Sequence, residues 1–180
     1  MKKNISTFLI IIITFSSVIA LSACRPMITI DDDTTAVHVL ESINSALGIQ
    51  SPCRGLYQMG ASQDSSRHMS NRLATLVYQG DQNGVHELSI LADYAVFLSC
   101  DHSLYEVHAM RVYSVADREQ IVKLLNRRLT LIRQREIYLF QPDSYESRVA
   151  DAMIYTRGDW IFLLATGNND VAVDVIRELT

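Results

Sequence analysis

Four neighbouring residues carry side chains that can bind a transition metal. They are a thiol, a carboxylate and two imidazoles, from Cys100, His102, Glu106 and His108. Zinc takes these ligand types in proteins. Glu106 and His108 fall within a predicted strand whereas Cys100 and His102 flank a predicted turn, so the spacing does not assure that the four converge. Scattered surface residues explain the group equally well, and we therefore expect neither a bound metal nor another cofactor.

Cys24 has a different chemistry, because it ends an apolar segment that begins after Lys2 and Lys3. Cations, an apolar run and small residues at its end are typical of a secretory signal peptide. The ending Leu21-Ser22-Ala23-Cys24 resembles the lipobox of bacterial lipoproteins, in which the thiol takes a diacylglyceryl group. We expect removal of residues 1–23, acyl chains such as palmitate on Cys24, and a stable anchor on the extracytoplasmic face of the cell membrane. An uncleaved membrane anchor and plain secretion are the alternatives, and the first is open because the uncharged stretch is about long enough to span a bilayer.

The two remaining thiols are Cys53 and Cys100. The extracytoplasmic space permits a disulfide between them. Such a bridge needs α-carbons within about 7 Å, which sequence spacing alone does not test. Two partly buried cysteines that act as small hydrophobes are the alternative, so the pairing stays open at this point.

Six cations lie in a predicted helix over 114–136, where a single basic face would suit phosphate or cell-wall polyanions. At 3.6 residues per turn they spread around the helix axis. We interpret them as a solvated outer face, with Lys123 and Arg127 opposite the core stripe. The six are Arg118, Lys123, Arg127, Arg128, Arg133 and Arg135.

The tripeptide Arg157-Gly158-Asp159 is one that integrins recognise in animal adhesion proteins. Here it falls between two predicted strands. Glycine accepts a positive φ and aspartate favours turns. We therefore interpret the tripeptide as the turn of a tight hairpin.

Charge balance and missing motifs argue against several classes of function. Removal of residues 1–23 takes two of the 16 Lys and Arg and none of the 20 Asp and Glu, which leaves a net charge of −6. An acidic domain is a poor candidate for binding nucleic acid. The sequence has no Gly-x-Ser-x-Gly, no phosphate-binding Gly-rich loop followed by Lys, no paired-cysteine zinc motif and no His-Glu-x-x-His. We therefore expect that the protein is not an enzyme.

A single domain over 34–180 is expected to position these residues, after a lipidated tether over 24–33. A first helix is predicted from Thr34 or Thr35 to Gly48. Residues 49–87 are ambiguous, with a helix over about 66–79 or a strand over 73–78. From Asp93 onward, the apolar periodicity predicts strands over 94–99 and 104–113, a helix over 114–136, strands over 152–156 and 160–166, and a final helix from about 168.

The element order ββαββα, after one N-terminal helix, predicts an α+β fold. Short connections favour an antiparallel sheet of about four strands with the helices packed on one face. The run Trp160–Leu164 is apolar without alternation. This local pattern indicates a strand that is covered on both faces.

Residues 88–180 and the lipobox together resemble a known family. The resemblance depends on Asp93-Tyr94-Ala95-Val96, Glu106, Asn126-Arg127-Arg128-Leu129, Tyr138-x-x-x-Pro142 and the segment 152–163. These features look like the lipoproteins of Gram-positive anaerobes that are grouped as domain of unknown function 4358. The resemblance implies a cell-surface lipoprotein and supplies no catalytic residues.

We expect a non-enzymatic binding or accessory module of the cell envelope, anchored through Cys24, with another envelope protein as its partner. The alternative is a surface lipoprotein that binds a small ligand or a metal through the hairpin over 100–108. The sequence does not identify the partner, the ligand or the oligomeric state.

Overall fold

The computed structural model describes residues 34–49, 54–81, 85–99, 105–134 and 149–180. A five-stranded sheet in the order β1-β2-β3-β5-β4 forms its centre, and every neighbouring pair is antiparallel. The elements are α2 (Ala36–Ala46), β1 (Arg54–Gln58), α3 (Asn71–Tyr78), η1 (His86–Ile90), β2 (Leu91–Ser99), β3 (Glu106–Val112), η2 (Val115–Asp117), α4 (Arg118–Gln134), β4 (Met153–Arg157), β5 (Trp160–Ala165) and α6 (Asn169–Leu179). The predicted α+β class and the order ββαββα from β2 onward are confirmed.

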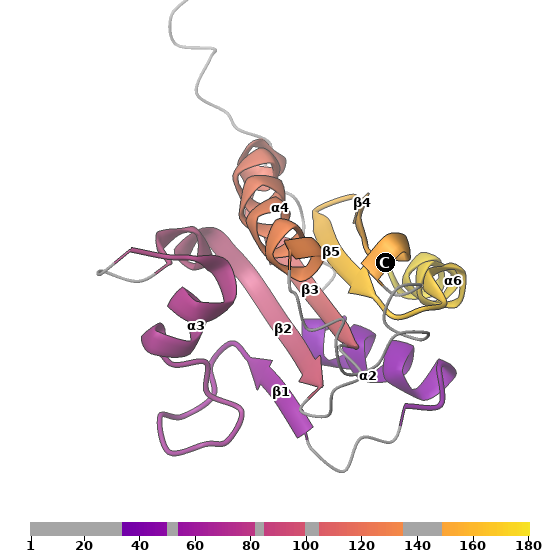
Figure 1. The fold of residues 1–180 in the computed structure, drawn as a ribbon, viewed down its shortest axis with the longest axis horizontal. Helices are drawn as coiled ribbons and strands as arrows, with labels where there is room; N and C mark the ends of the chain where they lie inside the picture. The colour runs from indigo at the N-terminus through magenta and orange to yellow at the C-terminus, as the bar shows by residue number, and fades with distance from the viewer. Residues whose placement is uncertain (1–33, 50–53, 82–84, 100–104, 135–148) are drawn as a thin grey trace, which may run out of the picture.

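Helices cover both faces of the sheet, so the prediction of one covered face was wrong. Side chains of α3 and α4 share a core with one face, and side chains of α2 and α6 share a second core with the other. Figure 1 shows α4 in front of the sheet, α3 to the left of β2, and α2 behind the strands. Every residue of β3 and β5 is buried, as the unbroken apolar run of β5 indicated locally. The helices that follow the two hairpins, α4 and α6, lie on opposite faces of the sheet.

The sheet has five strands where about four were expected, because β1 was not predicted. Gly55 of β1 lies opposite Leu98 of β2. A β-carbon on Gly55 would lie 2.3 Å from the Leu98 carbonyl oxygen, so this close approach requires glycine. Most of the neighbouring sequence consists of turn-forming residues, which concealed a five-residue strand.

The ambiguous segment before β2 contains a helix, α3, rather than a strand. The Ser70 hydroxyl caps it by accepting a hydrogen bond from the Leu73 amide at 3.3 Å. Gln79 ends it in the left-handed conformation, with φ 54°. None of the helices in the described ranges is long and apolar enough to cross a membrane.

The two ends of the described domain meet in the α2 and α6 layer. The Thr34 hydroxyl donates a hydrogen bond to the Leu179 carbonyl at 3.3 Å. The first amide of α2, on Ala36, donates to the Asp93 carboxylate of β2 at 2.7 Å. The start of α2 is thereby joined both to the end of α6 and to the sheet.

Candidate functional site

Four polar side chains from three elements meet beneath α4. Alternate residues of a strand point to one face, so Glu106 and His108 of β3 both point toward α3 and α4. Tyr78 comes from the end of α3, and Arg128 comes from the middle of α4. The exposed fractions are 6% for Glu106, 4% for Arg128 and zero for His108 and Tyr78. We call these four residues the buried polar cluster.

Short hydrogen bonds connect the cluster in one chain. Arg128 donates from Nε and Nη2 to the two carboxylate oxygens of Glu106, each at 2.6 Å. His108 Nε2 lies 2.6 Å from Glu106 Oε1. The Tyr78 hydroxyl lies 2.7 Å from His108 Nδ1. A paired arginine and carboxylate of this bidentate kind is among the strong hydrogen-bonded pairs in proteins.

Burial and charge determine the protonation states of Glu106 and His108. Burial raises the pKa of Glu106, but the hydrogen bonds from Arg128 and His108 and the positive charge of Arg128 outweigh it and lower that pKa from 4.5 to about 2. Burial lowers the pKa of His108, and the Glu106 charge opposes this effect without overcoming it. Glu106 is therefore ionised and His108 is neutral at pH 7.

The tautomer of His108 follows from its two partners. An ionised carboxylate only accepts hydrogen bonds, so Nε2 carries the proton and donates to Glu106. Nδ1 then has a lone pair and accepts from the hydroxyl of Tyr78. Burial, with a smaller effect from Glu106, raises the pKa of Tyr78 well above 10, so this hydroxyl keeps its proton.

The order tyrosine, histidine, carboxylate has the connectivity of a nucleophile, its base and an orienting group. Tyr78 is wholly buried, however, and its raised pKa opposes formation of a nucleophilic phenolate. The arrangement suits a different task, because it fixes α3, β3 and α4 relative to one another.

A pocket of about 390 Å³ opens beside the cluster, between α3, α4 and the adjoining ends of β2 and β3. Its volume is within the range of small-molecule sites. Leu76, which is 67% exposed, lies on its rim. The lining residues are Leu73, Leu76, Val77, Leu98, Ser99, Tyr105, Glu106 and Arg128. Glu106 and Arg128 thus belong to both the buried polar cluster and the pocket.

Two of the four sequence-predicted metal ligands are brought together, but no metal cluster forms in the described ranges. Glu106 and His108 are adjacent and buried, so the interpretation as scattered surface residues was wrong for them. Cys100 and His102 lie outside the described residues, as do Cys24 and Cys53. No group of three or more histidine, cysteine, aspartate or glutamate side chains suited to a metal occurs among the residues described. A metal at Glu106 and His108 would compete with Arg128 and Tyr78 for the same lone pairs.

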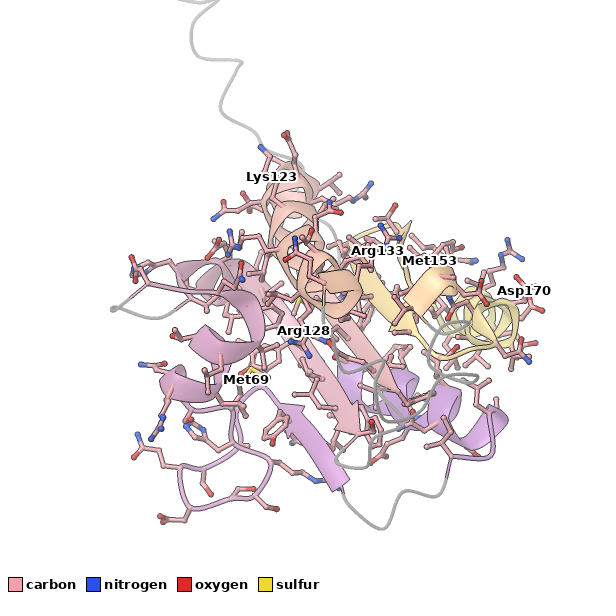
Figure 2. All side chains as sticks on the ribbon, viewed as in Figure 1. Met69, Lys123, Arg128, Arg133, Met153 and Asp170 are labelled. Atoms are coloured by element: carbon pink, nitrogen blue, oxygen red, sulfur yellow. The ribbon has the colours of Figure 1, made fainter. Side chains whose placement is uncertain are left out.

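Sequence reasoning missed the roles of Arg128 and Tyr78. Arg128 was expected on a solvated face, and the structure corrects this, because it is buried against the sheet. Figure 2 shows Arg128 beneath the lower end of α4, between this helix and the sheet, whereas Lys123 lies near the upper end of α4. The available signal was position: Arg128 follows Leu125 by three residues and precedes Ile132 by four, and both are core residues.

The Arg157-Gly158-Asp159 segment forms a turn, as predicted, and Asp159 is engaged within the domain. Gly158 has a φ of +57°. Asp159 is 8% exposed and accepts a hydrogen bond from Arg111 Nε at 2.8 Å. The Arg111 guanidinium also lies 5.3 Å from the ring centre of Trp160. A receptor that recognises an exposed aspartate would not reach this carboxylate.

Comparison of the chain with models of known protein families, with curated proteins and with solved structures found no match. The resemblance to domain of unknown function 4358 therefore stays a prediction.

Proposed function

We propose that this chain is a non-enzymatic, lipid-anchored binding module on the extracytoplasmic face of the cell membrane, and that the pocket is its ligand site. The single observation that carries the proposal is the pocket's composition. Leucine and valine side chains form half of the described lining, and one buried ion pair, Glu106 with Arg128, forms part of its polar side. Small-molecule sites combine largely apolar walls with a few fixed polar groups in this way.

The cluster supports binding rather than turnover. Arg128 holds both oxygens of Glu106, and His108 contacts one of them. These bonds keep the polar side of the pocket in one geometry without a ligand, which lowers the entropy lost on binding. No group with a free nucleophile is needed for this role.

The anchor proposal comes from the sequence. A lipidated Cys24 would carry at least two acyl chains, which suffice for stable attachment to a bilayer. The tether over 24–33 would keep the domain near the membrane surface. A partner protein of the envelope would then meet the domain at the membrane, and the exposed Leu76 at the pocket rim offers an apolar contact for it.

Methyl NMR of the full lipidated chain in nanodiscs tests the proposed site. Leucine and valine methyl groups would be isotope-labelled, and a small-molecule extract of the cell envelope would be added. We expect shifts at Leu73, Leu76, Val77 and Leu98, with Val115 in η2 as an exposed control outside the pocket. An extract that leaves every pocket methyl unmoved would overturn the proposal.

A further inference from the structure

The charged groups that line the pocket balance each other. Glu106 and Arg128 face each other across two hydrogen bonds of 2.6 Å. The other described lining residues are leucines, a valine, a serine and a tyrosine, which carry no charge at pH 7. His108, which contacts Glu106 from behind, adds no charge because it is neutral. The described lining therefore has a net charge of zero.

A ligand with a net charge would disturb this balance. An anionic group near Arg128 would also lie near the Glu106 carboxylate, and a cationic group near Glu106 would lie near the guanidinium. Either ion would lose hydration on entering the pocket, and the described lining residues offer it no counter-charge beyond the Glu106–Arg128 pair. A hydroxyl or amide group can donate toward a carboxylate and accept from a guanidinium while adding no charge.

The rest of the lining favours an apolar ligand body. Leu73, Leu76 and Val77 line the pocket from α3, and Leu98 lines it from β2. Leu76 remains 67% exposed, so a ligand chain that covers it would remove apolar surface from water. Such burial stabilises a complex roughly in proportion to the area covered.

We propose that the pocket selects an uncharged amphiphile, with one apolar chain or ring system and one hydroxyl or amide group set against the Glu106–Arg128 pair. This inference rests on the proposed function, because it assigns a ligand class to the same pocket. Such a molecule could reach the pocket from the bilayer or from the aqueous phase.

A series of ligands with one chain length and three charge states tests the selection. Decanol, decanoate and decyltrimethylammonium would be titrated at pH 7.5 into the full lipidated chain in nanodiscs, with empty nanodiscs as the blank. We expect decanol to bind at least tenfold more tightly than either ion. Equal or tighter binding of either ion would overturn the charge selection.

Variants connect the selectivity to named residues. Leu76→Gln should weaken decanol binding at least fivefold, whereas Val115→Gln, a matched change at another exposed apolar residue, should leave it unchanged. Glu106→Gln removes the negative charge that faces Arg128, so the preference should move at least tenfold toward decanoate. If Glu106→Gln does not fold, the wild-type series and Leu76→Gln still decide the question.

The failures of the two proposals are distinguishable. If the envelope extract shifts the pocket methyls but a charged member of the series binds best, the ligand class is wrong and the binding function stands. If neither the extract nor any of the three ligands affects the pocket, both proposals are wrong.

A further experiment identifies the source of the ligand. Uptake of monodecanoylglycerol from phosphatidylcholine vesicles would assign the ligand to the membrane. Uptake of dissolved decanol, without uptake from vesicles, would assign it to the aqueous phase, and both results support the uncharged class.

Discussion

Arg128 of α4 holds both carboxylate oxygens of Glu106, at the start of β3, through two hydrogen bonds of 2.6 Å. The two residues are 22 positions apart in the chain. This pair joins α4 to the central strand of the sheet, and it also lines the pocket. The stability of the fold and the proposed ligand binding therefore involve the same two side chains.

Replacement of Arg128 by methionine should lower the free energy of unfolding by about 3–5 kcal/mol, because the Glu106 charge would be left buried without its partner. Urea denaturation measures this loss. Lys123→Met is the matched control, since Lys123 pairs with Glu119 at the exposed surface and its loss should change stability little. The double variant Glu106→Leu with Arg128→Met should recover much of the loss. Equal costs for the two single variants would contradict the role assigned to Arg128.

Replacement of Tyr78 by phenylalanine removes the hydroxyl that donates to His108 Nδ1. The nitrogen would then be buried without a donor, at a cost of about 1–3 kcal/mol. Tyr113→Phe is the control, because Tyr113 is 57% exposed and should change stability little. Thermal and urea unfolding of the two variants give the comparison. A Tyr78→Phe protein as stable as wild type would show that this hydrogen bond contributes nothing.

Acid should destabilise the domain in two ranges of pH. The folded pKa of His108 is depressed below 6.5, so the unfolded chain takes up a proton first and stability falls as the pH drops below about 6.5. The pKa of Glu106 is lowered from its ordinary value of 4.5 to about 2 in the folded protein. The unfolded chain therefore takes up this proton first, and a second loss of stability should extend from about pH 4.5 downward.

Unfolding free energies measured from pH 8 to pH 3 test both steps. His108→Gln should remove the loss below pH 6.5, and Glu106→Gln should remove the lower one. A wild-type stability that stays constant between pH 7 and pH 5 would argue against a buried neutral His108.

A disulfide between Cys53 and Cys100 stays a prediction from the sequence, and both cysteines lie outside the described residues. The described pairing begins with Arg54 opposite Ser99, and the two cysteines are the next residues in each direction.

Alkylation of the denatured, unreduced chain, followed by mass spectrometry, tests this bridge. We expect Cys53 and Cys100 to be protected until a reductant is added. In Cys53→Ser, Cys100 should be alkylated without reduction. Alkylation of both cysteines in the unreduced wild-type chain would rule the bridge out.

Lipid attachment at Cys24 is testable in cells with labelled palmitate. The wild-type chain should incorporate the label and lose residues 1–23, whereas Cys24→Ala should incorporate none. Cys53→Ala, a matched change at a cysteine outside the lipobox, should be labelled normally. A wild-type chain that keeps residues 1–23 and takes up no label would favour the uncleaved anchor.

Local sequence patterns predicted most of the elements, but not the contacts between distant ones. The apolar stripe that includes Ile121 and Leu125 predicted α4, and the continuous run from Trp160 predicted that β5 is covered on both faces. The strand β1 has little apolar character of its own, and it is recognisable only through its pairing with β2. Arg128 looked like a solvated cation because its counter-charge, Glu106, comes from a different element. Burial of a charge depends on such tertiary partners, which neither residue reveals alone.

The hydrogen bond between Thr34 and Leu179 places the chain's entry into the domain and its exit at neighbouring points. Both points belong to the layer of α2 and α6, while the pocket lies in the layer of α3 and α4, across the sheet. The proposed lipid on Cys24 would therefore hold the domain by the layer of α2 and α6 and leave the layer of α3 and α4 on the far side of the sheet. A reporter group attached after Thr180 would be placed beside the tether, so it would report on distance from the bilayer and leave the pocket unobstructed.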